Sequence, residues 1–137
     1  PLMNIGPQMY PIQNTHAHCQ TLYALARMAG ITPEADGWTI SPRIPRSSYT
    51  FACNLFTLEV TPACIGGSVH LPVTADLRLK VQVPASWHSP IVSINGQGIE
   101  CAFAQDSITF TIHAKADEDV SWKITPEPGE TVLKGSQ

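Results

Sequence analysis

The stretch Asp76-Leu77-Arg78-Leu79-Lys80-Val81-Gln82-Val83 decides the fold, because aliphatic and polar side chains alternate strictly along it. Successive side chains of a β-strand point to opposite faces, so the alternation places one face on a core and the other in water. Strands of this kind are typical of antiparallel sheets with one solvated face. The stretch therefore predicts a strand of an antiparallel sheet that covers a hydrophobic core.

Several other segments share this period of two or are short and apolar. We expect strands at residues 39–40, 49–60, 68–71, 91–94, 99–104, 107–113 and 120–124. Asn95-Gly96 predicts a tight hairpin turn, since that turn needs positive φ at both central residues. Gly66-Gly67 and Gln105-Asp106 are expected to be turns as well. About eight short antiparallel strands, preceded by one helix, indicate a mainly β protein with a β-sandwich architecture.

The N-terminal part of the chain has a different character. Residues 1–13 hold several prolines, which favour extended chain. Residues 15–29 predict a helix, because good helix formers fill them and Gly30 and Pro33 follow. We therefore divide the chain into an extended segment with a helix at residues 1–36 and an antiparallel sandwich domain at residues 37–137.

The predicted helix is apolar on most of its sides, with Arg27 its only charged residue. A helix of this kind is normally buried between layers of a protein. A domain of this size has little with which to cover it, so we expect that the helix evolved inside a larger body. Without that body, we expect it to fold back on a sheet face or to pair with a second copy as a homodimer. The chain starts at Pro1, and we expect it to be a piece of a longer protein.

Composition excludes several classes of partner. The 137 residues are 43% hydrophobic and 14% charged, which suits one folded domain, and the net charge is −3. No basic stripe is present, so we expect no nucleic-acid partner. No apolar run approaches the roughly 20 residues of a membrane-spanning helix. We therefore expect no membrane partner either.

The four cysteines are Cys19, Cys53, Cys64 and Cys101, and none forms a C-x-x-C pair. Zinc ribbons and thioredoxin-like sites are therefore disfavoured. Cys53 and Cys101 alternate in step with apolar neighbours, which predicts small buried thiols. We expect reduced cysteines and a cytoplasmic setting. If the protein were exported, its four cysteines would permit two disulfides.

The densest group of chemically active side chains is His16, His18 and Cys19. Residues two apart on a helix point about 200° away from each other, so the two histidines cannot bind one ion. We expect neither a metal nor a cofactor. Two imidazoles in the first turn of a helix can instead bind a polar ligand or satisfy backbone groups nearby. His16 and His18 are therefore ligand-proximal candidates.

No arrangement typical of a catalytic centre is visible in the sequence. There is no G-x-S-x-G elbow and no phosphate-binding glycine loop, and the carboxylates lie in loops or on outward strand positions. We expect no catalytic residue in this chain. Trp122 is in step with core residues, whereas Trp87 lies in a loop. Trp87 is a candidate either for a sugar-stacking platform or for a lid over its own core.

Residues 14–25, followed by Gly30-Ile31-Thr32-Pro33 and Gly37-Trp38-Thr39-Ile40-Ser41-Pro42, form a recognisable pattern. It resembles the junction between the (α/α)6 barrel and the C-terminal β-sandwich of six-hairpin glycosidases such as the bacterial α-L-rhamnosidases. The resemblance implies that His16 or His18 stands for the histidine that opens the last barrel helix. Cys19-Gln20 stands where that family has an aromatic residue, so rhamnosidase specificity is not implied.

The resemblance leads to a function hypothesis with two alternatives. The chain would be a non-catalytic C-terminal module of a glycoside hydrolase, and its partner would be the catalytic barrel of the same parent chain. The first alternative is a standalone module that binds carbohydrate through Trp87 and its loop. The second is an interaction domain that self-associates through the helix.

Overall fold

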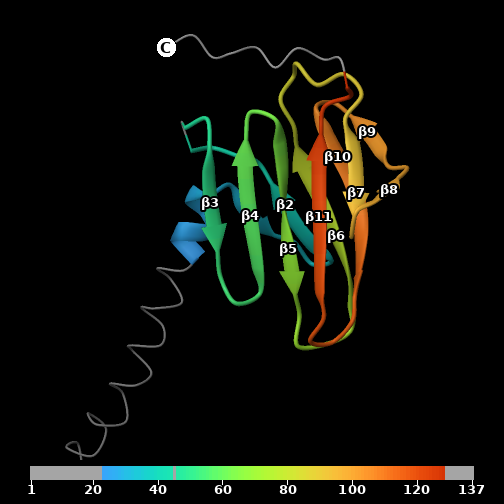
Figure 1. Ribbon diagram of the computed structural model, residues 1–137. Coiled ribbons are helices and arrows are strands. Elements are labelled where there is room, and N and C mark those ends of the chain that lie inside the picture. The colour runs from blue at the N-terminus through green and yellow to red at the C-terminus, as the bar shows by residue number, and fades with distance from the viewer. Residues whose placement is uncertain (1–22, 45, 129–137) are drawn as a thin grey trace, which may run out of the picture.

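The computed structural model describes residues 23–44 and 46–128, which form two β-sheets packed face to face (Figure 1). The five-stranded sheet has the order β1 (Ile31–Pro33), β2 (Gly37–Ile40), β6 (Ala75–Gln82), β10 (Ser107–Ala114) and β9 (Ala102–Ala104). The six-stranded sheet has the order β3 (Tyr49–Ala52), β4 (Phe56–Thr61), β5 (Cys64–His70), β11 (Asp119–Thr125), β7 (Ile91–Ile94) and β8 (Gln97–Ile99). The mainly β architecture predicted from the sequence is confirmed.

Alternating side chains of the long strands fill the space between the sheets. In β10, for example, Ile108 and Ile112 are fully buried, whereas Thr111 between them is exposed. Phe110 of the five-stranded sheet meets Trp122 of the six-stranded sheet, with ring centroids 5.8 Å apart. Because both sheets contribute to one core, neither is independent of the other.

The segment expected to be one strand at residues 49–60 is a hairpin. β3 and β4 pair antiparallel, with Tyr49 opposite Val60, and the chain turns at residues 53–55. The Cys53 amide donates a hydrogen bond to the Phe56 carbonyl oxygen (2.9 Å) and closes this turn. The prediction of a buried Cys53 is therefore wrong, because a thiol at a hairpin tip is exposed. Cys101 is half-buried and packs against the core.

The segment expected at residues 99–104 is also two strands. β8 belongs to the six-stranded sheet and β9 to the five-stranded sheet, so the chain crosses between the sheets at residues 100–101. The predicted turn at Asn95-Gly96 is confirmed, with φ of 49° and 80°. The turn at Gln105-Asp106 is confirmed too, with φ of 50° and 63°.

Gly66-Gly67 is not a turn but lies inside β5. A Cβ atom on Gly67 would overlap the Thr57 carbonyl oxygen of the neighbouring strand, so close approach of two backbones requires the glycine. The expectation that all strands are antiparallel is wrong at one place. β2 and β6 are parallel, with Gly37 opposite Arg78.

Residues 23–28 are helical, and they lie beside β3 at the edge of the six-stranded sheet (Figure 1). The helix ends as predicted, because the Gly30 amide donates to the Arg27 carbonyl oxygen and Gly30 has φ +88°. Residues 15–22 of the predicted helix lie outside the described residues. β1 follows at once and pairs antiparallel with β2, with Ile31 opposite Ile40.

Candidate functional site

The helix presents apolar side chains to solvent. Tyr23 is 48% exposed, Leu25 47% and Met28 66%. Leu25 and Met28, three residues apart, share one face of the one helix that the described residues contain, and we call this pair the helical surface, whereas Tyr23 points away from Leu25. Large exposed apolar side chains that gather on one element are typical of an interaction site.

A groove of about 510 Å³ continues this apolar character into the sandwich. Ala26 lines it from the helix and residues 51–56 line it from the β3–β4 hairpin. Leu55, at the tip of the hairpin, is 45% exposed. This apolar hollow between Ala26 and the tip of the hairpin is called the hairpin groove, and the residues of the helical surface do not line it.

The helix is held firmly on the sandwich by its other side. Ala26 packs against the core and Ala29 is buried in it. The Tyr49 hydroxyl donates a hydrogen bond to the Ala29 carbonyl oxygen (2.9 Å), and burial raises the pKa of Tyr49 above its usual value of 10.0. On the outer side, Arg27 donates to the Tyr23 hydroxyl (2.6 Å) and stacks 5.0 Å from that ring centre.

The connection from helix to sandwich is closely fitted. A Cβ atom on Gly30 would overlap the Ser41 carbonyl oxygen, and one on Gly37 would overlap the carbonyl oxygen of Arg78. The Ser41 amide donates to the Gly30 carbonyl oxygen (2.8 Å), and Arg78 pairs with Asp36 (2.9 Å). The chain therefore leaves the helix in one fixed direction.

Of the three ligand-proximal candidates predicted from the sequence, only Trp87 lies within the described residues. His16 and His18 lie outside the described residues. Trp87 lies in the loop after β6, but its side chain is only 4% exposed, and its amide donates to the Pro84 carbonyl oxygen (2.9 Å). Trp87 covers the core and offers no open ring face to a sugar.

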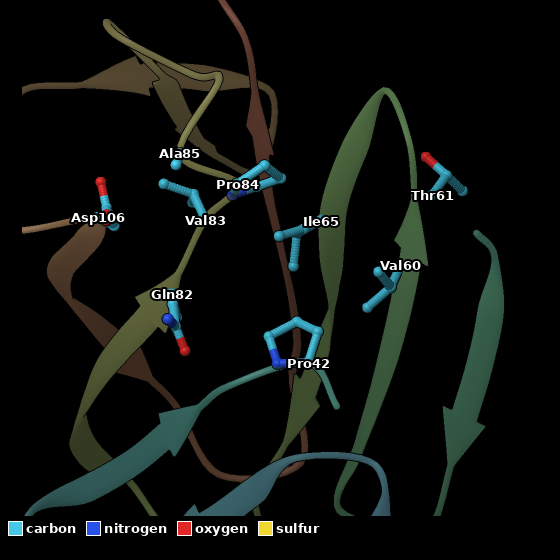
Figure 2. A pocket seen from close by; sticks show the side chains of 9 residues that line it. All are labelled: Pro42, Val60, Thr61, Ile65, Gln82, Val83, Pro84, Ala85 and Asp106. Atoms are coloured by element: carbon cyan, nitrogen blue, oxygen red, sulfur yellow. The ribbon is translucent and has the colours of Figure 1, made fainter. Parts of the chain in front are cut away.

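A second hollow, of about 330 Å³, opens between the two sheets (Figure 2). We call it the end cavity. Its lining comes from four distant parts of the sequence: Pro42, Val60, Thr61, Ile65, Gln82, Val83, Pro84, Ala85 and Asp106. Sequence reasoning missed it, because no local pattern shows which strand ends will meet.

Other reactive groups are scattered. Within residues 23–44 and 46–128, no three His, Cys, Asp or Glu side chains gather as a metal site would require. Cys53, Cys64 and Cys101 are free thiols, and burial raises the pKa of Cys101. His70 pairs with Asp119 across two strands. No helix in the described part of the chain is long and apolar enough to cross a membrane.

Comparison with known proteins shows no family for the chain. No family model matches the chain, and no curated protein matches it. Among solved structures, it is similar to a GH127 β-L-arabinofuranosidase from Geobacillus stearothermophilus T6, with 8% identity and a TM-score of 0.49. The match covers 71% of this chain and 16% of that enzyme. It assigns neither a family nor an activity to the chain.

Proposed function

We propose that the chain is a non-catalytic C-terminal β-sandwich module of a glycoside hydrolase and that it buttresses the (α/α)6 catalytic barrel of its parent enzyme. The observation that carries this proposal is the helical surface. One side of the helix is fixed to the sandwich through Ala26, Ala29 and Tyr49, and another exposes Leu25 and Met28. A helix fixed on one side and apolar on the other suits a place between two bodies.

The exposed apolar side chains of the helical surface are costly to leave in water. Full burial of a Leu, Met or Phe side chain contributes about 1.5–3 kcal/mol. Leu25 and Met28 are at least 47% exposed, so a covering body would gain a large part of that. The hairpin groove, which Ala26 of the same helix lines, offers a hollow for apolar side chains of the barrel.

The junction motif supports the same proposal. Gly30 and Gly37 are two of the residues on which the resemblance to six-hairpin glycosidases rests. In this chain both are sterically required, because a side chain at either position would overlap a backbone carbonyl oxygen. The motif therefore has a physical role here, which is to direct the chain from the helix into the first strands.

The first test is an activity assay. The chain alone and its full-length parent are assayed on a panel of aryl glycosides under the same conditions. We expect turnover by the parent and none by the chain. Turnover by the chain alone would overturn the proposal.

A second test uses substitutions in the parent enzyme. Met28→Asp places a charge on the helical surface, and we expect it to lower the thermal stability of the barrel. Val73→Asp is the matched control, because Val73 is similarly exposed at 60% but lies in the β5–β6 loop. Equal effects of the two substitutions would contradict docking at the helical surface.

Self-association through the same surface is a second candidate function, favoured by the same exposed side chains. Sedimentation of the chain over a range of concentrations tests it. A homodimer that Met28→Asp dissociates would support this candidate, and a monomer at all concentrations would exclude it.

A further inference from the structure

A hollow of about 560 Å³ lies on the outer face of the six-stranded sheet. It spans β4, β5, β11 and β7, which follow one another in that order across the sheet (Figure 1). We call it the outer hollow. Glu59, Gly66 and Lys123 form one row across it, because Gly66 is directly opposite Glu59 on one side and directly opposite Lys123 on the other.

Both charged side chains of this row stand on the outer face. Glu59 and Lys123 are exposed, whereas their chain neighbours Leu58 and Ile124 are fully buried. Successive residues of a strand point to opposite faces of the sheet, and residues directly opposite one another share a face. Glu59 and Lys123 therefore line the outer hollow from opposite sides.

The two charges are not paired with each other. Glu59 and Lys123 are two strands apart, which is roughly 10 Å between their backbones. Within residues 23–44 and 46–128, neither side chain takes part in an ion pair. His70 and Asp119, which are also opposite each other on β5 and β11, do pair, with Nδ1 and Oδ1 3.0 Å apart. The row thus holds one acid and one base that are available to a partner.

This row is complementary to itself. In a two-fold symmetric interface the same patch of two copies meets, so a contact from residue i to residue j occurs twice. If the axis runs parallel to β5 over Gly66, Glu59 of each copy faces Lys123 of the other. A Cβ atom on Gly66 would lie 2.8 Å from the Trp122 carbonyl oxygen, so the position on the axis carries no side chain that could hold the faces apart.

The polar groups beside this row are already hydrogen-bonded within the sheet. The hydroxyl oxygens of Thr57 and Ser68 are 2.9 Å apart, and the Ser68 amide donates to the same Thr57 oxygen (3.0 Å). The Ser121 amide donates to Asn95 Oδ1 (2.9 Å). Groups that are satisfied in this way lose less when a partner displaces water from them.

The outer face of the five-stranded sheet lacks this complementarity. Its strands hold one acid, Asp76, which pairs with His113 (2.6 Å). Arg78 on the same face pairs with Asp36 (2.9 Å). Lys80 is exposed on that face, and two copies that met there would bring no available acid to it. Charge therefore favours the six-stranded sheet as the face on which two copies meet.

We propose that the outer hollow is the centre of an interface between two copies of the chain, with Glu59 of each copy paired with Lys123 of the other. The interface is polar, so the dimer is transient, and its Kd rises with salt because salt screens the ion pairs. It uses no residue of the helical surface and does not depend on barrel docking.

The test is an exchange of charges, followed by sedimentation equilibrium of the chain at low salt. Glu59→Lys and Lys123→Glu each turn both ion pairs of the dimer into like-charge contacts, and each should raise the Kd about tenfold or more. An equal mixture of the two variants should dimerise again, because every contact then joins an acid and a base. A wild-type chain that stays monomeric, or a mixture that does not recover, would overturn the proposal.

Lys80→Glu is the matched control, because it makes the same change of charge on an exposed strand residue of the other sheet. It should leave the Kd unchanged. An equal rise in Lys80→Glu and Lys123→Glu would mean that net charge matters and the face does not. The dimer should also survive Met28→Asp. A dimer that Met28→Asp dissociates and Lys123→Glu leaves intact would belong to the helical surface, and the proposal would be wrong.

Cross-linking locates the axis independently. Cys64 lines the outer hollow on β5, two residues before Gly66, so an axis along β5 brings the Cys64 thiols of two copies together. A short bismaleimide should join Cys64 of one copy to Cys64 of the other, as peptide mass spectrometry would show. Cys53, which is more exposed at the hairpin tip, should react without joining the copies. Links through Cys53 and none through Cys64 would contradict the proposed interface.

Discussion

Strand β10 and the helix at residues 23–28 are both rich in apolar side chains, but these side chains are buried in the strand and largely exposed on the helix. In β10 the apolar positions fall on one face, and Ile108 and Ile112 are fully buried. In the helix they fall on several faces, and Leu25 and Met28 remain exposed while Ala29 is buried. A strand whose apolar residues recur at every second position buries all of them in the core of its own module. A helix that is apolar on several faces keeps some of these side chains exposed, and they are free to contact another protein body.

The largest expected difference in stability between the strands and the helix comes from two substitutions of leucine by alanine. Leu79→Ala in β6 removes a fully buried side chain and should lower the free energy of unfolding by about 2–5 kcal/mol. Leu25→Ala removes a half-exposed one and should cost less than about 0.5 kcal/mol in the chain alone. Urea denaturation followed by circular dichroism measures both. Similar losses at the two sites would show that the helix is part of the module's own core.

The junction between helix and sandwich gives the next effect. Gly30→Ala and Gly96→Ala both place a side chain at positive φ, which costs about 1–2 kcal/mol. Only at Gly30 would the new Cβ overlap a backbone carbonyl, whereas Gly96 has nothing within 4 Å. Overpacking should add about 1–3 kcal/mol at Gly30. The difference between the unfolding free energies of the two variants measures the cost of the overlap at Gly30. Equal losses would mean that the backbone at Gly30 can move away from Ser41 without loss of stability.

Tyr49 links the helix to the six-stranded sheet in a way that depends on pH. Burial raises the pKa of Tyr49 in the folded state above 10.0, so the neutral phenol stabilises the fold. That contribution is fully present below pH 10.0 and is lost as the pH rises through the folded-state pKa. Tyr49→Phe should therefore flatten the fall in stability above that pH. A fall of unchanged steepness in the variant would place the titrating group elsewhere.

The smallest effect is expected at the exposed pair of Arg78 and Asp36. Exposed ion pairs contribute about 0–1 kcal/mol, and these side chains are 50% and 61% exposed. Asp36→Asn should lower the free energy of unfolding within that range, and high salt should remove the difference. The backbone bond from the Arg78 amide to the Asp36 carbonyl oxygen is unaffected by the substitution. A loss well above 1 kcal/mol that persists in salt would contradict a solvated pair.

The long strands could be predicted from the sequence because their alternation is local. β6, β10 and β11 lie where the period of two places them. The β3–β4 turn was missed because no glycine or proline marks residues 53–55, and the alternation continues across them. Gly66-Gly67 was misread because the close approach of a neighbouring strand, which is not local, demanded the glycines.

The candidate sites show the same limit. The apolar helix and its end at Gly30 could be predicted from helix formers and a glycine at the C-terminus. The end cavity could not, because Pro42, Ile65, Gln82 and Asp106 meet only after both sheets form. The burial of Trp87 also depends on distant neighbours, since a loop tryptophan can cover a core or face solvent. His16 and His18 remain predictions.

The accessibility of Met28 tests the central claim most directly. Met28 is 66% exposed in the chain, so peroxide should convert it readily to the sulfoxide, which peptide mass spectrometry quantifies. In the parent enzyme, a docked barrel should cover the helical surface and slow this oxidation. Equal rates of Met28 oxidation in the chain and in the parent would contradict the account.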